Sequence, residues 1–298
     1  MTDDGVMARC CRRGHDETTY DDRRNEDANV DDLRTDLVVT RHGQPAGAAP
    51  TLLFLHGLTD SGQAWPEAVA HWAGSYAIVA VDQRGHGRSP RFTEEQLAAH
   101  PGEVMVDDAT AVLGQLDTPP VVAGHSLGGA VALTVGVRRP ELVRALVLED
   151  PAPLGPGDLQ ADRAKGERFV AGVRQSIETA DDDTLLRLRR EQRPAWPDSE
   201  LLASGRSERQ VDLDYLARGD IKPSTPWSEL FADVTVPVLV VSGDPDGDVC
   251  VTDEMEQGIA QLGNDNVTLT RVKGAEHCIR REQPEQFYSI VDDWLRRL

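Results

Sequence analysis

The sequence predicts an α/β domain in which helices cover both faces of a mostly parallel sheet. Three features predict it: short, continuously apolar runs, segments of helical spacing between them, and one long helical stretch without a strand-like run. An uninterrupted apolar run is typical of a strand buried on both faces, since a half-exposed strand alternates polar and apolar residues. Strands that alternate with helices favour parallel pairing, because parallel neighbours need a crossover connection.

Seven segments have the strand pattern and are rich in Val, Leu or other strand-forming residues. They are residues 37–40, 51–55, 76–81, 120–124, 142–149, 236–243 and 267–272. Helices with an apolar face are expected at residues 102–116, 127–139 and 284–298. The last helix places Phe287, Val291 and Trp294 on one side. It closes with Arg296 and Arg297, whose charge complements the helix dipole.

The predicted elements divide the chain into three parts. Residues 1–33 are highly charged and almost free of apolar side chains, so we expect a disordered acidic tail. Residues 34–150 and 234–298 contain all seven strand patterns and form the predicted core. Residues 151–233 are charged and helical in pattern, and we expect a helical cap over one end of the sheet. A set of ordinary surface helices is the alternative for that segment.

The net charge of the chain limits the classes of binding partner that we expect. The formal net charge is −20 over 298 residues, which repels nucleic acids and anionic membrane surfaces. No apolar run approaches the roughly 18 residues that a membrane-spanning helix needs. We therefore expect a small-molecule substrate, with no nucleic acid and no membrane as partner.

The four cysteines are Cys10, Cys11, Cys250 and Cys278. They form neither a C-x-x-C pattern nor a disulfide framework, which favours a reducing cytoplasm as the compartment. Cys250 and Cys278 each follow a predicted strand, so a disulfide between them is an alternative to the two free thiols that we expect.

The segment VVAGHSLGGA (121–130) predicts a nucleophile. It combines a strand, the pattern G-x-S-x-G and a helix, and in that context the pattern is typical of a serine held on a strained turn. Gly124 and Gly128 relieve the crowding on either side of Ser126. The helix that follows directs its N-terminal N–H groups at charge that develops beside the serine.

A serine needs a general base at neutral pH, and His277 is the candidate. It lies after the last predicted strand and before the C-terminal helix. His125, His86 and His56 are expected to be structural. The segment LFLHGL (53–58) ends another buried strand, and we expect the backbone N–H groups of Leu58 and Leu127 to form an oxyanion hole.

These segments resemble the α/β-hydrolase fold superfamily. LFLHGLTDSGQAW, AVDQRGHGRS, VVAGHSLGG, LVLEDPA, VPVLVVSGD and GAEHCIRREQPEQF occur in the order typical of its members. The resemblance covers residues 36–150 and 230–298 and implies a Ser-Asp/Glu-His triad. It also implies a cap inserted between strands 6 and 7 of the family's sheet. Related dehalogenases and epoxide hydrolases carry Asp where this chain has Ser126.

The sequence does not decide which residue is the acid of the triad. In one subgroup that the segment GDPDGDVCVTDE resembles, the recurring acid directly follows the glycine, which selects Asp244. The commoner pattern Gly-x-x-Asp selects Asp246 as the alternative. Asp248 is less favoured, and Asp150, which follows the strand at 142–149, is the position that only a few members use.

The resemblance implies a serine hydrolase that cleaves a carboxylic ester or a related acyl bond, such as a lactone or thioester, of a small, partly hydrophobic substrate. Alternatives with the same triad are a C–C bond hydrolase and a cofactor-free perhydrolase or acyltransferase; a non-catalytic small-molecule receptor is the rival class. No metal-ligand spacing or phosphate-binding loop occurs, so we expect neither a metal nor a cofactor. Trp196, Leu201, Tyr215 and Trp227 would shape the pocket or pack within the cap.

Overall fold

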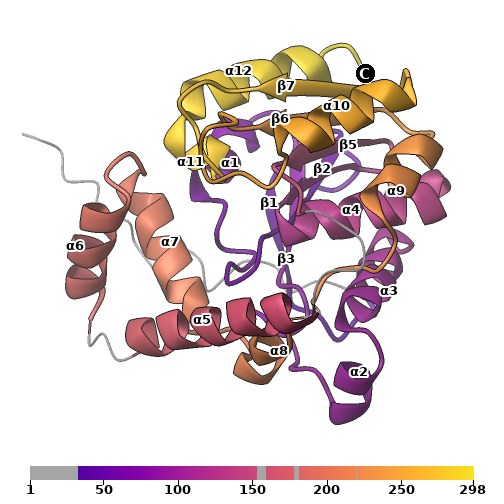
Figure 1. Ribbon diagram of the computed structural model, residues 1–298. Helices are drawn as coiled ribbons and strands as arrows, with labels where there is room; N and C mark the ends of the chain where they lie inside the picture. Colours follow the sequence, from indigo (N-terminus) through magenta and orange to yellow (C-terminus); the bar gives the residue numbers. More distant parts are fainter. Residues whose placement is uncertain (1–32, 153–158, 178–180, 220) are drawn as a thin grey trace, which may run out of the picture.

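A seven-stranded sheet forms the centre of the computed structural model, which describes residues 33–152, 159–177, 181–219 and 221–298 (Figure 1). The strands are β1 (Val39–Gly43), β2 (Thr51–Leu55), β3 (Ala77–Val81), β4 (Val121–His125), β5 (Ala145–Glu149), β6 (Val238–Ser242) and β7 (Val267–Arg271). Their order is β1-β3-β2-β4-β5-β6-β7. Only the pairing of β1 with β3 is antiparallel in this sheet, so the predicted fold class is confirmed.

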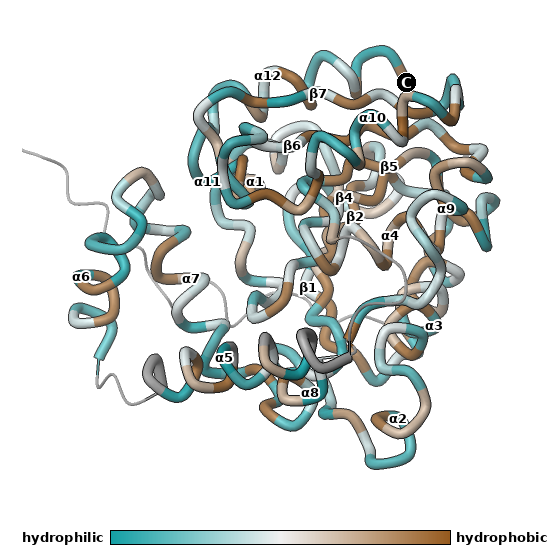
Figure 2. The backbone as a smooth tube through the Cα atoms, in the orientation of Figure 1, coloured by the Kyte–Doolittle hydropathy of each residue, from teal (hydrophilic) through white to brown (hydrophobic). Residues whose placement is uncertain are grey.

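Two apolar layers cover the sheet. On one face, α1 (Pro66–Trp72), α11 (Ile279–Glu282) and α12 (Pro284–Leu295) contribute to a cluster with side chains of the strands. On the other face lie α3 (Pro101–Leu113), α4 (Leu127–Arg138), α9 (Trp227–Asp233) and α10 (Asp253–Leu262). The short α2 (Glu94–Ala98) begins with a capping box between Thr93 and Gln96. In Figure 2 brown predominates around the central strands β2 and β4, which marks the apolar core between these layers.

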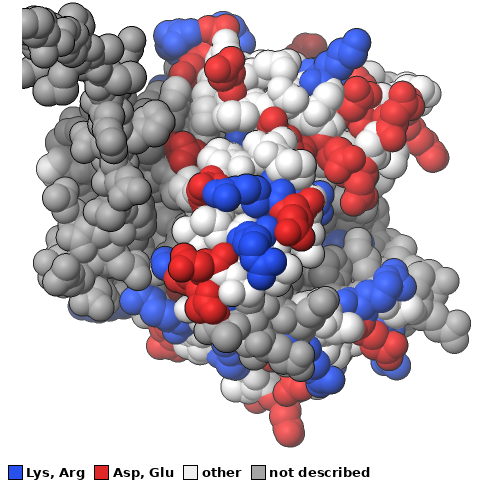
Figure 3. Space-filling model, turned by 90° about the vertical axis from the view of Figure 1, so that its left-hand side faces the viewer, with Lys and Arg blue, Asp and Glu red and all other residues white. Residues whose placement is uncertain are grey.

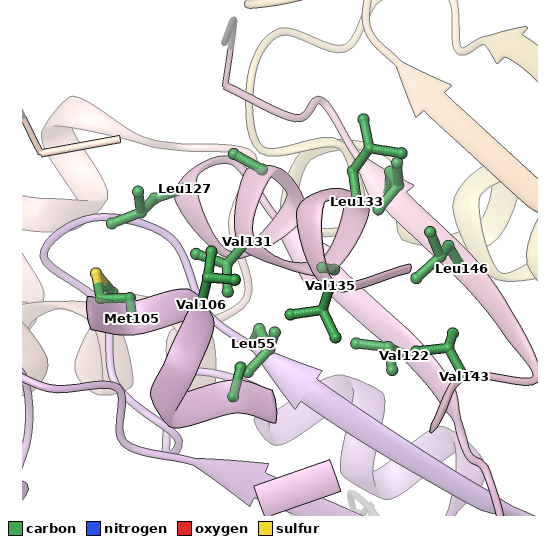
Figure 4. Packing of buried hydrophobic residues seen from close by; sticks show 14 of the residues in the cluster. Leu55, Met105, Val106, Val122, Leu127, Val131, Leu133, Val135, Val143 and Leu146 are labelled. Carbon is green, nitrogen blue, oxygen red and sulfur yellow. The ribbon is translucent and has the colours of Figure 1, made fainter. Parts of the chain in front are cut away.

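Helix α4 packs closely on the sheet because its residues are small. Figure 4 shows Val131 and Val135 of α4 between Val106 of α3 and the side chains of the strands. A Cβ atom on Gly128 would lie 2.1 Å from the carbonyl oxygen of Leu55, which no side chain tolerates. Glycine at this position therefore lets the first turn of α4 touch the end of β2.

The segment predicted to be a cap runs from the end of β5 to the start of β6. Its described part contains α5 (Leu159–Ile177), α6 (Asp182–Gln192), α7 (Asp198–Glu208), α8 (Leu213–Arg218) and α9. Helix α5 contacts α8 and α6 contacts α7, beside the sheet in Figure 1. Helix α9, by contrast, packs against α4 and α10 and so belongs to the layer that covers the sheet. We call residues 151–226 the inserted helices below.

The inserted helices have a mixed surface. On the face shown in Figure 3, acidic and basic side chains lie beside one another rather than grouped by sign. The ion pairs Arg190–Asp198 and Arg206–Asp182 lie on α6 and α7. In the part of the chain that the structure describes, no helix combines the length and the apolar character that crossing a bilayer requires.

The structure differs slightly from the predicted boundaries of two segments. Residues 1–32, for which a disordered tail was predicted, lie outside the described residues. Leu33, the last residue of that predicted tail, packs against the core instead. The strand expected at 142–149 begins only at Ala145, because residues Pro140–Leu142 form a 3₁₀ turn.

Candidate active site

Ser126 occupies a strained turn between β4 and α4. Its backbone has φ 51° and ψ −114°, outside the region that non-glycine residues normally adopt. A Cβ atom on Gly124 would lie 2.5 Å from the carbonyl oxygen of Gly128, so this turn requires glycine at position 124. Such strain costs on the order of 1–3 kcal/mol and persists only where the surrounding structure imposes it. The geometry is the one that the sequence predicts for a nucleophile.

His277 lies in the loop before α11, and its ring is fixed by Asp150. The ring Nδ1 donates a hydrogen bond of 2.6 Å to Oδ2 of Asp150, because a carboxylate can only accept. Asp150 is fully buried, whereas 30% of the His277 side chain is exposed. This bond leaves Nε2 of His277 as the ring nitrogen that can accept a proton.

Two neighbours determine the proton affinity of His277. Burial by itself favours the neutral ring, but the hydrogen bond to Asp150 and the adjacent Cys250 thiol oppose it, and the pKa of His277 lies well above its usual value. A raised pKa means that the ring holds a proton to higher pH than a free histidine does. The neutral form, which can act as a base, therefore gains population toward alkaline pH.

Asp150 is held by three further hydrogen bonds. Its Oδ1 accepts from Oγ of Ser242 at 2.7 Å and from the N–H of Val251 at 3.1 Å. Its Oδ2 accepts from the N–H of Cys250 at 2.7 Å as well as from His277. A buried carboxylate with four donors is compensated for its loss of water, and its orientation is fixed.

The structure contradicts the prediction that Asp244, or alternatively Asp246, contacts His277. Asp244 donates its N–H to the carbonyl oxygen of Ala275 and accepts from the N–H of Gly274 at 3.3 Å. A tight turn from Asp244 to Gly247 leaves Asp246 exposed. The loop after β6 thus supplies backbone N–H groups to Asp150 rather than a carboxylate to the histidine. Asp248 lines the pocket, but the ring of His277 pairs with Asp150 instead.

One sequence signal could have identified Asp150. It directly follows a strand whose five residues are all buried, and a carboxylate in that position requires several polar partners. It is also the residue after Glu149, which pairs with His125 in the register of β4 and β5. The strand ends that carry Ser126 and Asp150 are therefore neighbours in the sheet, but this requires the strand order, which the sequence alone does not give.

The predicted oxyanion residues lie beside the serine. Leu58 follows the end of β2, Leu127 is the first residue of α4, and both line the same pocket as Ser126 and His277. Gly57 is needed for this approach, because a Cβ atom there would lie 2.6 Å from Nδ1 of His125.

The other three histidines named from the sequence are buried and serve packing or hydrogen bonding. His125 donates from Nε2 to the carbonyl oxygen of His277 at 3.1 Å, and burial holds its pKa well below the usual value. His56 accepts at Nε2 from the N–H of Gln83 at 3.0 Å. The rings of His56 and His86 meet edge to face, and neither residue lines the pocket.

A pocket of about 440 Å³ opens above Ser126 and His277. The inserted helices contribute Trp196 and Leu201 to its lining. The other two large residues expected there pack elsewhere. Tyr215 stacks on Phe92 with ring centroids 4.7 Å apart, and the ring of Trp227 lies against Gly258 of α10. Two of the four side chains thus reach the pocket.

Two consecutive arginines, which the sequence does not single out, connect the inserted helices to the core. Nε of Arg281 donates to Glu200 of α7 at 2.7 Å, and its Nη2 contacts both oxygens of Asp60 at 3.1 Å. Arg280 pairs with Glu149 at 2.6 Å. All five side chains are buried. In the sequence RRE resembles an ordinary surface helix, and only the tertiary structure identifies the network.

Cys250 and Cys278 are free thiols that line the pocket, so the alternative disulfide is not formed. Burial raises the pKa of Cys278 to about 11. Among the described residues, Asp150, Cys250 and His277 form one group that could hold a metal ion. A carboxylate oxygen, the sulfur and a ring nitrogen lie within 4.8 Å of one another.

Comparisons with known proteins identify the family of this chain. Lipase LipV of Mycobacterium tuberculosis is 44% identical over 118 residues, which are 39% of this chain and 42% of that protein. The 2-(acetamidomethylene)succinate hydrolase of Mesorhizobium japonicum is 26% identical over 86% of this chain and 92% of its own. The crystal structure of an E-2-(acetamidomethylene)succinate hydrolase shares the fold with a TM-score of 0.72 at 23% identity, over 87% of this chain and 94% of that one. The model of the alpha/beta hydrolase family matches residues 52–290. The chain therefore belongs to the alpha/beta hydrolase family, and it is a hydrolase.

Proposed function

We propose that this hydrolase is a serine hydrolase that cleaves a carboxylic ester, or a related acyl bond such as a lactone or thioester, through an acyl-enzyme on Ser126. One observation carries the proposal: a serine with a strained backbone lines the same pocket as a histidine that a buried carboxylate orients. Nucleophile, base and orienting acid are the three roles of a hydrolytic triad.

In the proposed mechanism, Nε2 of His277 takes the hydroxyl proton of Ser126 while the oxygen attacks the acyl carbon. Asp150 keeps the proton on Nδ1 and stabilises the imidazolium that forms. The N–H groups of Leu58 and Leu127 stabilise the oxyanion, and each such donor contributes about 10²–10³ to the rate. His277 then gives its proton to the leaving group, and the same ring activates a water molecule that releases the acid.

Four cations and three acids, Asp248 among them, line the pocket, and we take this balance to favour a substrate that carries a carboxylate. Arg281 and Arg189 line the pocket but are paired with Glu200 and Glu208. Lys222 also lines it and forms no ion pair with a described residue.

Arg193 supplies a second cation at the pocket. Its closest carboxylate is Glu276, at 3.8 Å, and both side chains are about half exposed. The name of the Mesorhizobium relative, a 2-(acetamidomethylene)succinate hydrolase, supports an anionic substrate as well. We therefore propose an acyl substrate whose carboxylate binds near Lys222 and Arg193, inside a chain whose overall charge is strongly negative.

Labelling with a fluorophosphonate probe tests the nucleophile. We expect rapid labelling of the wild type and none of Ser126→Ala, with labelling at least about 10³-fold slower in His277→Ala because the base is lost. A panel of p-nitrophenyl esters, lactones and thioesters, each with and without a carboxylate, then tests the bond and the charge. An unlabelled protein that binds a small molecule tightly would favour a non-catalytic receptor instead.

The same panel, extended by three additions, distinguishes ester hydrolysis from the reactions that could use the same residues. Adding a diketone, hydrogen peroxide or an acceptor alcohol to the assays tests C–C hydrolysis, perhydrolysis and acyl transfer in turn. A cytoplasmic location and a small-molecule partner stay predictions.

A further inference from the structure

We propose that Cys250 and His277 together bind a soft divalent metal ion, such as Zn²⁺ or Cd²⁺, and that the bound ion inhibits the hydrolase. The inhibition rests on the proposed function, since the ion would take the nitrogen that activates Ser126. The binding itself does not depend on it.

The donor atoms are already close to one another. The sulfur of Cys250, a ring nitrogen of His277 and a carboxylate oxygen of Asp150 lie within 4.8 Å of one another. A zinc ion with bonds of about 2.3 Å to sulfur and 2.0–2.1 Å to nitrogen holds these two atoms about 3.5 Å apart in tetrahedral geometry. Binding would therefore draw the side chains of Cys250 and His277 together by up to about 1.3 Å.

Asp150 acts here as the outer partner rather than as a ligand. It accepts from Ser242, Cys250 and Val251 besides His277, so its oxygens are occupied. Histidines that bind metals usually donate their second ring N–H to a carboxylate, and this bond orients the ring and raises its basicity. The bond from Nδ1 of His277 to Asp150 has that arrangement, and it leaves Nε2 as the ring's donor to a metal.

The chemistry of the donors selects the ion. Sulfur and imidazole nitrogen suit Zn²⁺, Cd²⁺ and similar ions, whereas Mg²⁺ and Ca²⁺ require several oxygen ligands. Both side chains are partly exposed and line the 440 Å³ pocket, so an ion can reach them without unfolding the protein. With only two protein ligands, water or solute anions would complete the coordination, which predicts moderate and reversible binding.

A cadmium titration of the full chain tests the binding. Cys10 and Cys11 are adjacent thiols that would also bind cadmium, so every protein carries Cys10→Ser and Cys11→Ser. The ultraviolet absorption of cadmium–thiolate bonds should appear in this background and in Cys278→Ser, and should disappear in Cys250→Ser. Cys278 is the matched control, because its thiol lines the same pocket but lies outside the group of three donors.

The histidine is tested separately. His277→Ala removes a proposed metal ligand and should weaken cadmium binding at least about 10-fold. Removing even a residue that hydrogen-bonds to a metal ligand typically costs about 10–100-fold in affinity. An absorption band that survives in Cys250→Ser, or an unchanged affinity in His277→Ala, would overturn the shared site. Substitution of Cys250 preserves its backbone N–H to Asp150; circular dichroism verifies the fold, and Cys250→Ala serves as a second variant.

Inhibition is measured against each protein's own activity without metal. Zn²⁺ should inhibit the background protein and Cys278→Ser at concentrations at least about 10-fold lower than those that inhibit Cys250→Ser. A chelator should restore activity, and Mg²⁺ or Ca²⁺ should have no effect. Cadmium binding without inhibition would overturn the inhibitory role. If no substrate is hydrolysed at all, the proposed function fails while the absorption titration still decides the metal site.

Discussion

The ends of the central strands and the inserted helices are built in opposite ways. At the strand ends, Asp150 is fully buried and receives four hydrogen bonds that fix its position. On the inserted helices, the ion pair Arg190–Asp198 is open to solvent, and each of its side chains is more than half accessible. Exposed pairs contribute little to stability. The difference indicates that the strand ends fix the orientation of a buried carboxylate, whereas this exposed pair fixes little. Under the proposed function, the strand ends orient the triad, and the inserted helices line the substrate pocket.

The largest expected effect separates the two candidate acids. Asp150→Asn should lower kcat by about 10⁴, because the wrong tautomer of His277 then dominates. Asp244→Asn, the matched control, should change kcat by less than about 2-fold, since the Asp244 carboxylate accepts from the N–H of Gly274 and not from His277. Steady-state kinetics on one ester decides between them. The reverse result would assign the triad acid to the loop after β6.

The second effect concerns the connection between the two regions. Glu200→Gln should destabilise the protein by about 3 kcal/mol, because it removes one partner of the buried Arg281 while Asp60 still pairs with it. That corresponds to a fall of about 6–12 °C in Tm. Asp198→Asn breaks the exposed pair with Arg190 and should leave Tm unchanged. Thermal unfolding by circular dichroism measures both; equal shifts would show that burial does not distinguish these pairs.

The third effect is a pH profile. Because the pKa of His277 is raised and the base must be neutral, kcat/KM should rise with pH through an apparent pKa above 6.5. Below that pKa the rate should fall about tenfold per pH unit. In Asp150→Asn the remaining activity should titrate at lower pH, since the hydrogen bond that favours the protonated ring is weakened. A profile that is flat from about pH 6 to pH 9 would contradict the role of His277.

The smallest expected effect tests the inserted helices, in the segment 151–226. Lys222→Met should raise KM about 10-fold for a substrate that carries a carboxylate, with kcat nearly unchanged, because a charge-assisted contact that binds substrate and transition state equally is lost. A neutral ester of the same length is the control and should be unaffected. If KM rises equally for both substrates, Lys222 acts through the shape of the pocket rather than through its charge.

The fold and two of the three proposed triad residues were predictable from the sequence because their signals are local. Apolar runs locate the strands, and the two glycines around Ser126 indicate the strained turn. Asp150 was not selected, because three aspartates after β6 fit the usual position and nothing local shows that their loop turns toward Gly274. Arg280 and Arg281 were missed for the same reason, since their partners Glu149 and Glu200 are distant in the chain.

The order of the reacting groups along the chain has a practical consequence. Ser126 and Asp150 precede the inserted helices, whereas His277 follows them, together with the N–H groups of Cys250 and Val251 that hold Asp150. A cut between β5 and β6 therefore yields two fragments, neither of which contains all three residues of the proposed triad. Hydrolysis would return only when the fragments reassemble and the β5–β6 pairing forms again. Recovered turnover would then report on any pair of proteins that brings the two fragments together.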